Sequence, residues 1–235
     1  MHQLLSKTRY ATVHGLRSDH TFNKTQAKLH QRLFFSHDNL KTVSLHYSQV
    51  LPAYHDVWRK EQEQSGLSTK PLHQLPDATA AQIIHMQNAR ENHGLRSTLF
   101  MSRYDLAVHR PTTRAALESI DLAALFNSIR KSTTRCLGTL DFDDSESLGF
   151  AVFRLIMANV DAGYYTQLLS EVFACDLAGV MFPEGMSGLA LEEVRTRGMR
   201  YRKVVLEPGA SRSEMDILRD FWGRNPSVDT FSAAV

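Results

Sequence analysis

The chain has 235 residues, of which 43% are hydrophobic and 22% charged, and its formal net charge is +2 at pH 7. These globular values exclude a collagen and a disordered tail, and the charge is too small to predict a nucleic-acid partner. No run approaches about 18 consecutive apolar residues, so no membrane span is predicted. The opening residues lack the pattern of a signal peptide, and the expected location is therefore cytoplasmic.

Cysteine and histidine give no strong metal or redox signal. Cys136 and Cys175 form no CxxC pair and are predicted to be buried thiols. Seven histidines fall in the first quarter of the chain: His2, His14, His20, His30, His37, His46 and His55. Their spacings match no standard zinc pattern, and no HxxxH pair with a nearby carboxylate occurs among them. We therefore predict no metal site and no cofactor.

Apolar periodicity predicts helices along the chain. A first helix is predicted over 38–50, with Asp38 as its N-cap. Its apolar face would consist of Leu40, Val43, Tyr47 and Val50. A loop is expected over 68–76, and a long helix follows over 77–109 until a proline-containing break ends it. A further apolar stripe over 122–129 predicts the next helix.

The second half of the chain carries the most apolar helical pattern. An acidic loop over 137–147 precedes a helix predicted over 148–172, which should be the most deeply buried. Its repeating apolar positions are Leu148, Val152, Leu155, Ile156, Val160, Tyr164, Leu168 and Val172. The segment 182–188 ends this region, and two shorter helices follow. Ser211 and Glu214 form an S-x-x-E pattern, which predicts a capping box at the start of the last long helix.

No stretch of any length alternates with the period of a strand, and no internal repeat is present. The predicted fold is all-α. The loop at 132–147 would separate two helical layers, but it is not predicted to be a domain boundary. Residues 1–235 are therefore expected to form a single helical domain.

Four segments match, in order, segments of a known family. They are the opening MHQLLSKTRYATVHG, YDLAVHRP at 104–111, VDAGYYTQLLSEVF at 160–173, and RYRKVVLEPGASRSEMDILRDFWGRNPSVDTF at 200–231. Together they resemble the C-terminal part of the catalytic domain of the thimet oligopeptidase family, and its fungal saccharolysin branch most of all. The resemblance implies a multi-helix lobe, one of two that line a deep channel in that family.

The resemblance also locates the family's zinc site. A helix of the family carries His-Glu-x-x-His, with two zinc-binding histidines and a glutamate general base. Met1 and His2 line up with residues just after this motif, so we expect both histidine ligands and the glutamate to be absent. The third ligand is a glutamate on the next helix, and the family spacing lands on Lys24; a second family glutamate lines up with Gln31. A protonated amine repels a metal dication, so the resemblance implies that zinc binding is lost.

The family's substrate-contacting residues are partly replaced as well. A histidine lines up with Leu155, and two tyrosines line up with Val160 and Gln167, whereas Tyr164 and Tyr165 are kept. A shortened copy of a working enzyme would retain these residues. Their joint loss indicates that peptidase chemistry has been abandoned, with the short chain as the natural form.

A single lobe would expose to solvent the face that, in the family, packs against the other half of the catalytic domain. Large exposed apolar patches are uncommon on soluble monomers, so we expect self-association, a partner or rearranged helices. A homodimer is the first expectation, because isologous pairing needs no second gene.

The preferred functional hypothesis is a groove that binds a small molecule and could transform it without a metal, as a cyclase, isomerase or lyase. Lys24 would stabilise an anion, act as a base or form a Schiff base, and His14 or His20 would move protons. The predicted catalytic residues are Lys24, His14 and His20, and the predicted ligand-binding residues are Tyr164, Tyr165, Gln167 and Gln31. The alternative interpretations are a solvent-facing Lys24, a core tyrosine at 164 and a structural histidine at 14.

Two other functions are kept beside this hypothesis. One is a non-catalytic pseudopeptidase that binds peptides or a protein partner. The other is a fragment of a true zinc metalloendopeptidase whose other half is supplied separately, and Lys24 argues against it. None of the three functions involves a nucleic acid or a membrane.

Overall fold

The computed structural model describes residues 2–66, 71–134, 149–153 and 160–234, and within these ranges the chain forms helices and turns without a strand. The prediction of an all-α fold is confirmed. None of the helices in the described ranges has both the length and the apolar character that crossing a bilayer demands.

Eleven α-helices follow one another along the described part of the chain. They are α1 (His2–Leu5), α2 (His20–Phe34), α3 (His37–Val43), α4 (Pro52–Ser65), α5 (Asp77–His109), α6 (Arg114–Glu118), α7 (Leu122–Thr134), α8 (Thr166–Met181), α9 (Leu191–Tyr201), α10 (Glu214–Trp222) and α11 (Asp229–Ala234). Short 3₁₀ or π segments are η1 (Ala11–Val13), η2 (Gly15–Arg17), η3 (Tyr47–Gln49), η4 (Gly149–Val152) and η6 (Arg202–Leu206).

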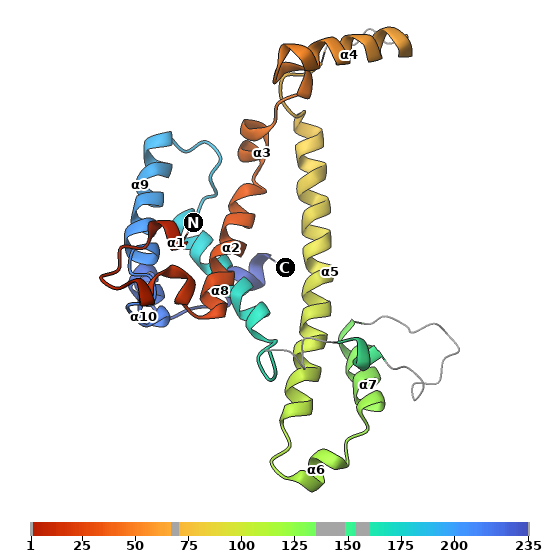
Figure 1. Ribbon diagram of the computed structural model, residues 1–235, viewed down its shortest axis with the longest axis vertical. Coiled ribbons are helices and arrows are strands. Elements are labelled where there is room, and N and C mark those ends of the chain that lie inside the picture. Colours follow the sequence, from red (N-terminus) through yellow and green to blue (C-terminus); the bar gives the residue numbers. More distant parts are fainter. Residues whose placement is uncertain (1, 67–70, 135–148, 154–159, 235) are drawn as a thin grey trace.

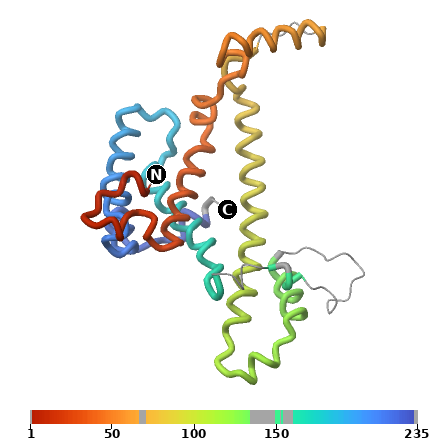
Figure 2. The backbone as a smooth tube through the Cα atoms, viewed as in Figure 1, coloured from red at the N-terminus to blue at the C-terminus, as the bar shows by residue number. Residues whose placement is uncertain are grey.

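The long helix α5 runs along the longest dimension of the molecule (Figure 1). At one end of α5, α4 projects sideways away from the other helices, and at the opposite end α6 and α7 turn back beside α5 (Figures 1 and 2). The helices α1, α2, α8, α9 and α10 gather beside the middle of α5 in a compact group, which we call the helical body.

The main hydrophobic core lies inside the helical body. It forms because α2 and α8 each turn an apolar face inward, where residues three and four positions apart share one side of a helix. Its fully buried members include Phe22, Leu29, Ala174, Leu177, Val205, Ile217, Leu218 and Phe221. At about 25 cal/mol per Å² of apolar surface removed from water, burial of such side chains is the main force holding these helices together.

A second, smaller core lies between α5, α7 and η4. Phe100 and Tyr104 of α5 meet Phe126 of α7 edge to face, with ring centroids 4.8 and 5.1 Å apart. The predictions of a helix over 77–109 and of a stripe over 122–129 are confirmed by α5 and α7. Residues 137–147 and the cysteine at 136 lie outside the described residues, and the structure does not test whether 1–235 is one domain.

The helix predicted over 38–50 is wrong in extent. α3 ends at Val43, and Ser44 is extended because its hydroxyl donates to the carbonyl of Lys41 and accepts from the backbone N–H of Leu75. Asp38 is not the N-cap, since the hydroxyl of Ser36 accepts the capping bond from Asn39. These side-chain bonds compete with the helical ladder and stop it.

The helix predicted over 148–172 is also wrong in extent, because α8 begins only at Thr166. A turn over 161–165 precedes it, and Ala162 in this turn has a positive φ of 54°. The buried carboxylate of Asp105 on α5 accepts backbone N–H bonds from Ala162 and Tyr164, at 3.0 and 2.9 Å. These bonds hold the turn, and Leu148, Leu155 and Ile156 of the predicted helix lie outside the described residues.

The predicted capping box at Ser211 and Glu214 is not formed. The hydroxyl of Ser211 donates to the carbonyl of Pro208, and α10 starts at Glu214 itself, after an N-cap at Ser213. The carboxylate of Glu214 instead accepts from the backbone N–H of Asp19, at the start of α2. The acidic side chain therefore ties α10 to α2 rather than capping its own helix.

Candidate functional site

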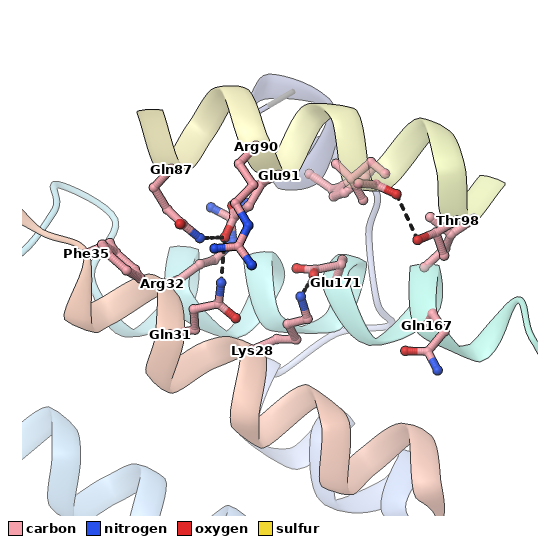
Figure 3. A pocket seen from close by; sticks show the side chains of 14 residues that line it. Lys28, Gln31, Arg32, Phe35, Gln87, Arg90, Glu91, Thr98, Gln167 and Glu171 are labelled. Carbon is pink, nitrogen blue, oxygen red and sulfur yellow. Dashed lines mark hydrogen bonds and ion pairs between the residues drawn. The ribbon is translucent and has the colours of Figure 1, made fainter. Parts of the chain in front are cut away.

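A cavity of about 380 Å³ lies where α2, α5 and α8 come together, with α11 closing one side (Figure 3). Its walls are mostly polar and charged. The lining residues are Lys28, Gln31, Arg32 and Phe35 of α2 and its C-cap; Gln87, Arg90, Glu91, Gly94, Leu95 and Thr98 of α5; Gln167, Leu168 and Glu171 of α8; and Phe231 of α11. Two predicted ligand-binding residues, Gln31 and Gln167, are therefore brought together in one cavity.

The helix α2 reaches this cavity because its two faces differ. Its N-terminus is capped by Asp19, whose carboxylate accepts from the backbone N–H of Thr21 at 2.7 Å. Burial opposes ionisation of this carboxyl, but hydrogen bonds from Thr21 and neighbouring N–H groups outweigh it and lower the pKa of Asp19. Phe22 and Leu29 pack into the core on one face. The opposite face carries the lining residues at a spacing of three and four positions.

Hydrogen bonds organise the walls of the cavity. Oε1 of Glu91 accepts from the side-chain amides of Gln31 and Gln87, at 2.9 and 3.0 Å. Lys28 and Glu171 form an ion pair across the α2–α8 contact (Figure 3). The two carboxylates of the cavity are thus already engaged by an amine and two amides.

The two retained tyrosines, Tyr164 and Tyr165, shortly precede the lining residue Gln167 in the sequence but do not line the cavity. Tyr164 packs edge to face against Phe153, with centroids 4.9 Å apart, and belongs to the smaller core. Burial raises the pKa of the Tyr164 hydroxyl. Tyr165, at the start of α8, is 44% exposed. Their predicted role in ligand binding stays a prediction.

The predicted catalytic residues are not gathered at the cavity either. Nδ1 of His14 accepts from the backbone N–H of Leu16 at 3.2 Å and caps η2. His20 is the exposed first residue of α2, and Lys24 lies one turn before Lys28 on the same helix. None of these three side chains lines the cavity, and the structure does not test their chemistry.

A sequence profile described as "Peptidase family M3" matches residues 1–235. The chain belongs to peptidase family M3. It is 30% identical to "Oligopeptidase PhomG" of Diaporthe leptostromiformis, over 99% of this chain and 32% of the relative. It is 31% identical to "Oligopeptidase PhomG'" of the same organism, over 99% of this chain and 19% of the relative. It is 27% identical to "Saccharolysin" of Saccharomyces cerevisiae, over 78% of this chain and 24% of the relative.

This M3 chain spans about a third and a fifth of the length of the two Diaporthe relatives it matches. Its all-α architecture agrees with the helical lobe that the resemblance implied. The zinc site of the family can be tested at position 24, where the resemblance places a glutamate ligand.

Lys24 and its surroundings do not fit the binding of a zinc ion. The Lys24 side chain is half-buried, and burial, with a smaller contribution from the charge of Lys28, lowers its pKa. Within the described ranges Lys24 has no hydrogen bond or ion pair, and no three His, Cys, Asp or Glu side chains come together as a metal-binding group. Two neighbouring ammonium groups repel a dication, whereas a carboxylate would attract it.

The sequence analysis predicted none of the charged residues that line the cavity, namely Lys28, Arg32, Arg90, Glu91 and Glu171. A signal was present, because α5 carries polar or small residues at 87, 90, 91, 94 and 98, which share one helical face. Such a polar stripe ordinarily indicates a solvent-facing surface. Its position opposite α2 and α8 follows only from the tertiary structure.

Proposed function

We propose that this M3 chain has lost zinc-dependent peptidase chemistry and binds a small polar molecule, without a metal, in the cavity between α2, α5 and α8. The single observation that carries the first half of this proposal is Lys24. It places a cation where the resemblance to the family calls for a metal-binding carboxylate.

The electrostatic argument is independent of any reaction scheme. Replacing a carboxylate by an ammonium reverses the sign of the charge that a metal ion would meet. Lys28, one turn further along α2, adds a second positive charge, although Glu171 pairs with it. Lys24 has no such partner among the described residues. The charge at this point of α2 therefore favours an anion rather than a metal ion.

The cavity supports the second half of the proposal. Its volume of about 380 Å³ falls within the range of small-molecule sites, which is roughly 300–1,000 Å³. Amide groups of Gln31, Gln87 and Gln167 offer both donors and acceptors to a polar ligand, and the hydroxyl of Thr98, which donates to the carbonyl of Gly94, offers an acceptor. Any transformation of the bound molecule would be metal-independent.

A fragment of a true zinc metalloendopeptidase is the second candidate. The observation in its favour is that the chain spans only about a third and a fifth of the relatives named oligopeptidase. This candidate requires the zinc-binding histidines to come from another polypeptide and zinc to be held despite Lys24. A non-catalytic peptide-binding protein is the third candidate, favoured by the exposed aromatic ring of Tyr165.

The first experiment measures zinc and peptidase activity on the purified chain, alone and mixed with a polypeptide that carries the family's His-Glu-x-x-His motif, because the second candidate takes its zinc-binding histidines from such a partner. After dialysis against zinc and then buffer, inductively coupled plasma mass spectrometry should find no stoichiometric zinc. A panel of quenched-fluorescent peptides should remain uncleaved. Stoichiometric zinc together with cleavage that a chelator abolishes would overturn the proposal and establish the metalloendopeptidase candidate.

The second experiment fills the cavity. A Cβ added to Gly94, which lines the cavity, meets no atom within 4 Å, and the same holds for Gly198 of α9, outside the lining. Gly94→Leu should therefore occupy the cavity without a clash, and Gly198→Leu is the matched control. A small-molecule ligand that raises the melting temperature of the wild type should lose this effect in Gly94→Leu and keep it in Gly198→Leu. The same shift in Gly94→Leu would contradict binding in this cavity.

A further inference from the structure

We propose that the end of the cavity formed by Arg32 and Arg90 binds the carboxylate of a small organic acid. This inference rests on the proposed small-molecule function and names the chemical class of the ligand. Figure 3 shows Arg32, Arg90, Gln31, Gln87 and Glu91 at one end of the cavity, whereas Thr98 and Gln167 lie toward the other end.

Among the described residues, the cavity is lined by more positively than negatively charged side chains, and its two arginines form no ion pair with its carboxylates. Lys28, Arg32 and Arg90 are cations, and Glu91 and Glu171 are anions. Glu171 pairs with Lys28, and Glu91 accepts hydrogen bonds from two neutral amides rather than from an arginine. Within the part of the chain that the structure describes, neither arginine has an ion pair with a carboxylate. Two guanidinium groups therefore face the cavity without a carboxylate partner.

Arg32 supplies the more specific observation. Its Nε is buried and has no hydrogen-bond partner among the described residues. The residue instead faces the thiol of Cys175, which lies in the core of the helical body. Burial raises the pKa of Cys175 to about 11, so the thiol is neutral at physiological pH and does not compensate the guanidinium. The buried Nε is itself out of reach of a ligand, so a ligand would meet the terminal nitrogens of the Arg32 guanidinium, which are not among the buried atoms without a partner.

Arg90 stands on α5 at the exposed side of the same end. A guanidinium presents a planar fork of N–H donors that matches both oxygens of a carboxylate. Because the side chain of Arg90 is exposed to solvent, a ligand would reach it without a separation of α2, α5 and α8.

The charge at this end sets the class of anion. Arg32 and Arg90 contribute two positive charges and Glu91 one negative charge, which leaves a single positive charge. A carboxylate neutralises that charge, whereas a phosphate dianion would leave a net negative charge at this end. The amide of Gln167 and the hydroxyl of Thr98 at the other end would contact a neutral polar group of the same molecule.

The test compares acids with their own amides by isothermal titration calorimetry. The probes are N-acetyl-leucine with N-acetyl-leucinamide, and 4-hydroxybenzoate with 4-hydroxybenzamide, at millimolar concentration; inorganic phosphate forms a separate arm. At least one acid should bind about tenfold more tightly than its amide, the size expected for a hydrogen bond to a charged group. This preference should weaken as the salt concentration rises.

Arg90→Gln should remove the preference for the acid and leave the weaker binding of the amide. Arg96→Gln is the matched control, because Arg96 is an exposed arginine on the same helix, outside the lining. It should keep the preference. An exposed position is chosen for the decisive variant because Arg32, with its buried Nε, would also affect folding.

The remaining outcomes separate the two proposals. Equal binding of acid and amide, a preference that survives Arg90→Gln, or tighter binding of phosphate than of either acid overturns the carboxylate site. If Gly94→Leu still abolishes binding in that case, the small-molecule function stands. Absence of binding for every probe overturns the carboxylate site, and binding that Gly94→Leu leaves unchanged overturns the cavity as the site of both proposals.

Discussion

The helices α8 and α4 have similar lengths, 16 and 14 residues, but opposite surroundings. Seven residues of α8 are buried, including Phe173, Leu177 and Asp176, whereas no residue of α4 is buried. α8 packs against α2 along its length, while α4 projects from the end of α5 and contacts mainly η3 (Figure 1). The comparison shows that stability is concentrated in the helical body and that α4 contributes little to it.

The largest effect is expected in the core of the helical body. Leu177→Ala should lower the free energy of unfolding by about 3–4 kcal/mol, because it removes a fully buried side chain and leaves a cavity. Urea denaturation monitored by circular dichroism measures this change. Leu106→Ala on α5 is the control, since Leu106 is 46% exposed and should lose less than about 1 kcal/mol. Equal losses would show that burial in the core of the helical body does not decide the effect of shortening a leucine.

The next effect comes from the ion pair that joins Asp176 of α8 to Arg224, which follows α10. The fully buried carboxylate of Asp176 accepts hydrogen bonds from the guanidinium of Arg224 and from the backbone N–H of Ser227. Arg224→Met should lower the free energy of unfolding by about 2–3 kcal/mol, because it leaves a buried charge uncompensated although Arg224 itself is partly exposed. Arg195→Met, at an exposed position of α9, should be close to neutral in the same urea titration. A loss no larger than that of the control would show that the pair contributes nothing.

A smaller, pH-dependent effect is expected at Lys24. Burial, then the charge of Lys28, lowers the pKa of Lys24 in the folded chain below its unfolded value of 10.5. The folded state therefore disfavours the charged amine below the folded pKa, and this penalty disappears as the pH rises toward 10.5. Lys24→Gln should be more stable than the wild type at pH 7, and the difference should shrink at pH 10.

The control for this titration is Lys60→Gln, at an exposed position of α4. It should show no such convergence between the two pH values. A Lys24→Gln variant that is less stable than the wild type at pH 7 would mean that the ammonium makes a favourable contact in the folded chain.

The smallest effect is expected on α4. Val57→Ala should change the free energy of unfolding by less than about 0.5 kcal/mol, because Val57 is 48% exposed. The measurement is repeated over a range of protein concentrations, with light scattering to report the oligomeric state. A large, concentration-dependent loss would contradict the isolated α4 seen here, and it would locate on this helix the homodimer that the sequence predicts.

The sequence predictions were accurate where a short-range pattern decides the helix, and they were wrong where contacts between distant segments decide it. α5 and α7 were predicted well because their apolar positions repeat locally and a proline-containing segment separates them. The start of α8 was predicted wrongly because Asp105, which holds the preceding turn, is far away in the sequence. For the site, Gln31 and Gln167 were found through the family resemblance and do line the cavity. Arg32 and Arg90 were missed because polar residues on a helix ordinarily face solvent.

The sequence by itself determined the all-α class, the family and the cation at position 24, since each depends on residue identity or on short-range periodicity. The tertiary structure decided which polar residues face one another and where helices stop, because these depend on hydrogen bonds between segments distant in the chain. Asp105 holds the turn before α8 through such bonds, and the packing of α2, α5 and α8 turns an ordinary polar stripe into the wall of a charged cavity.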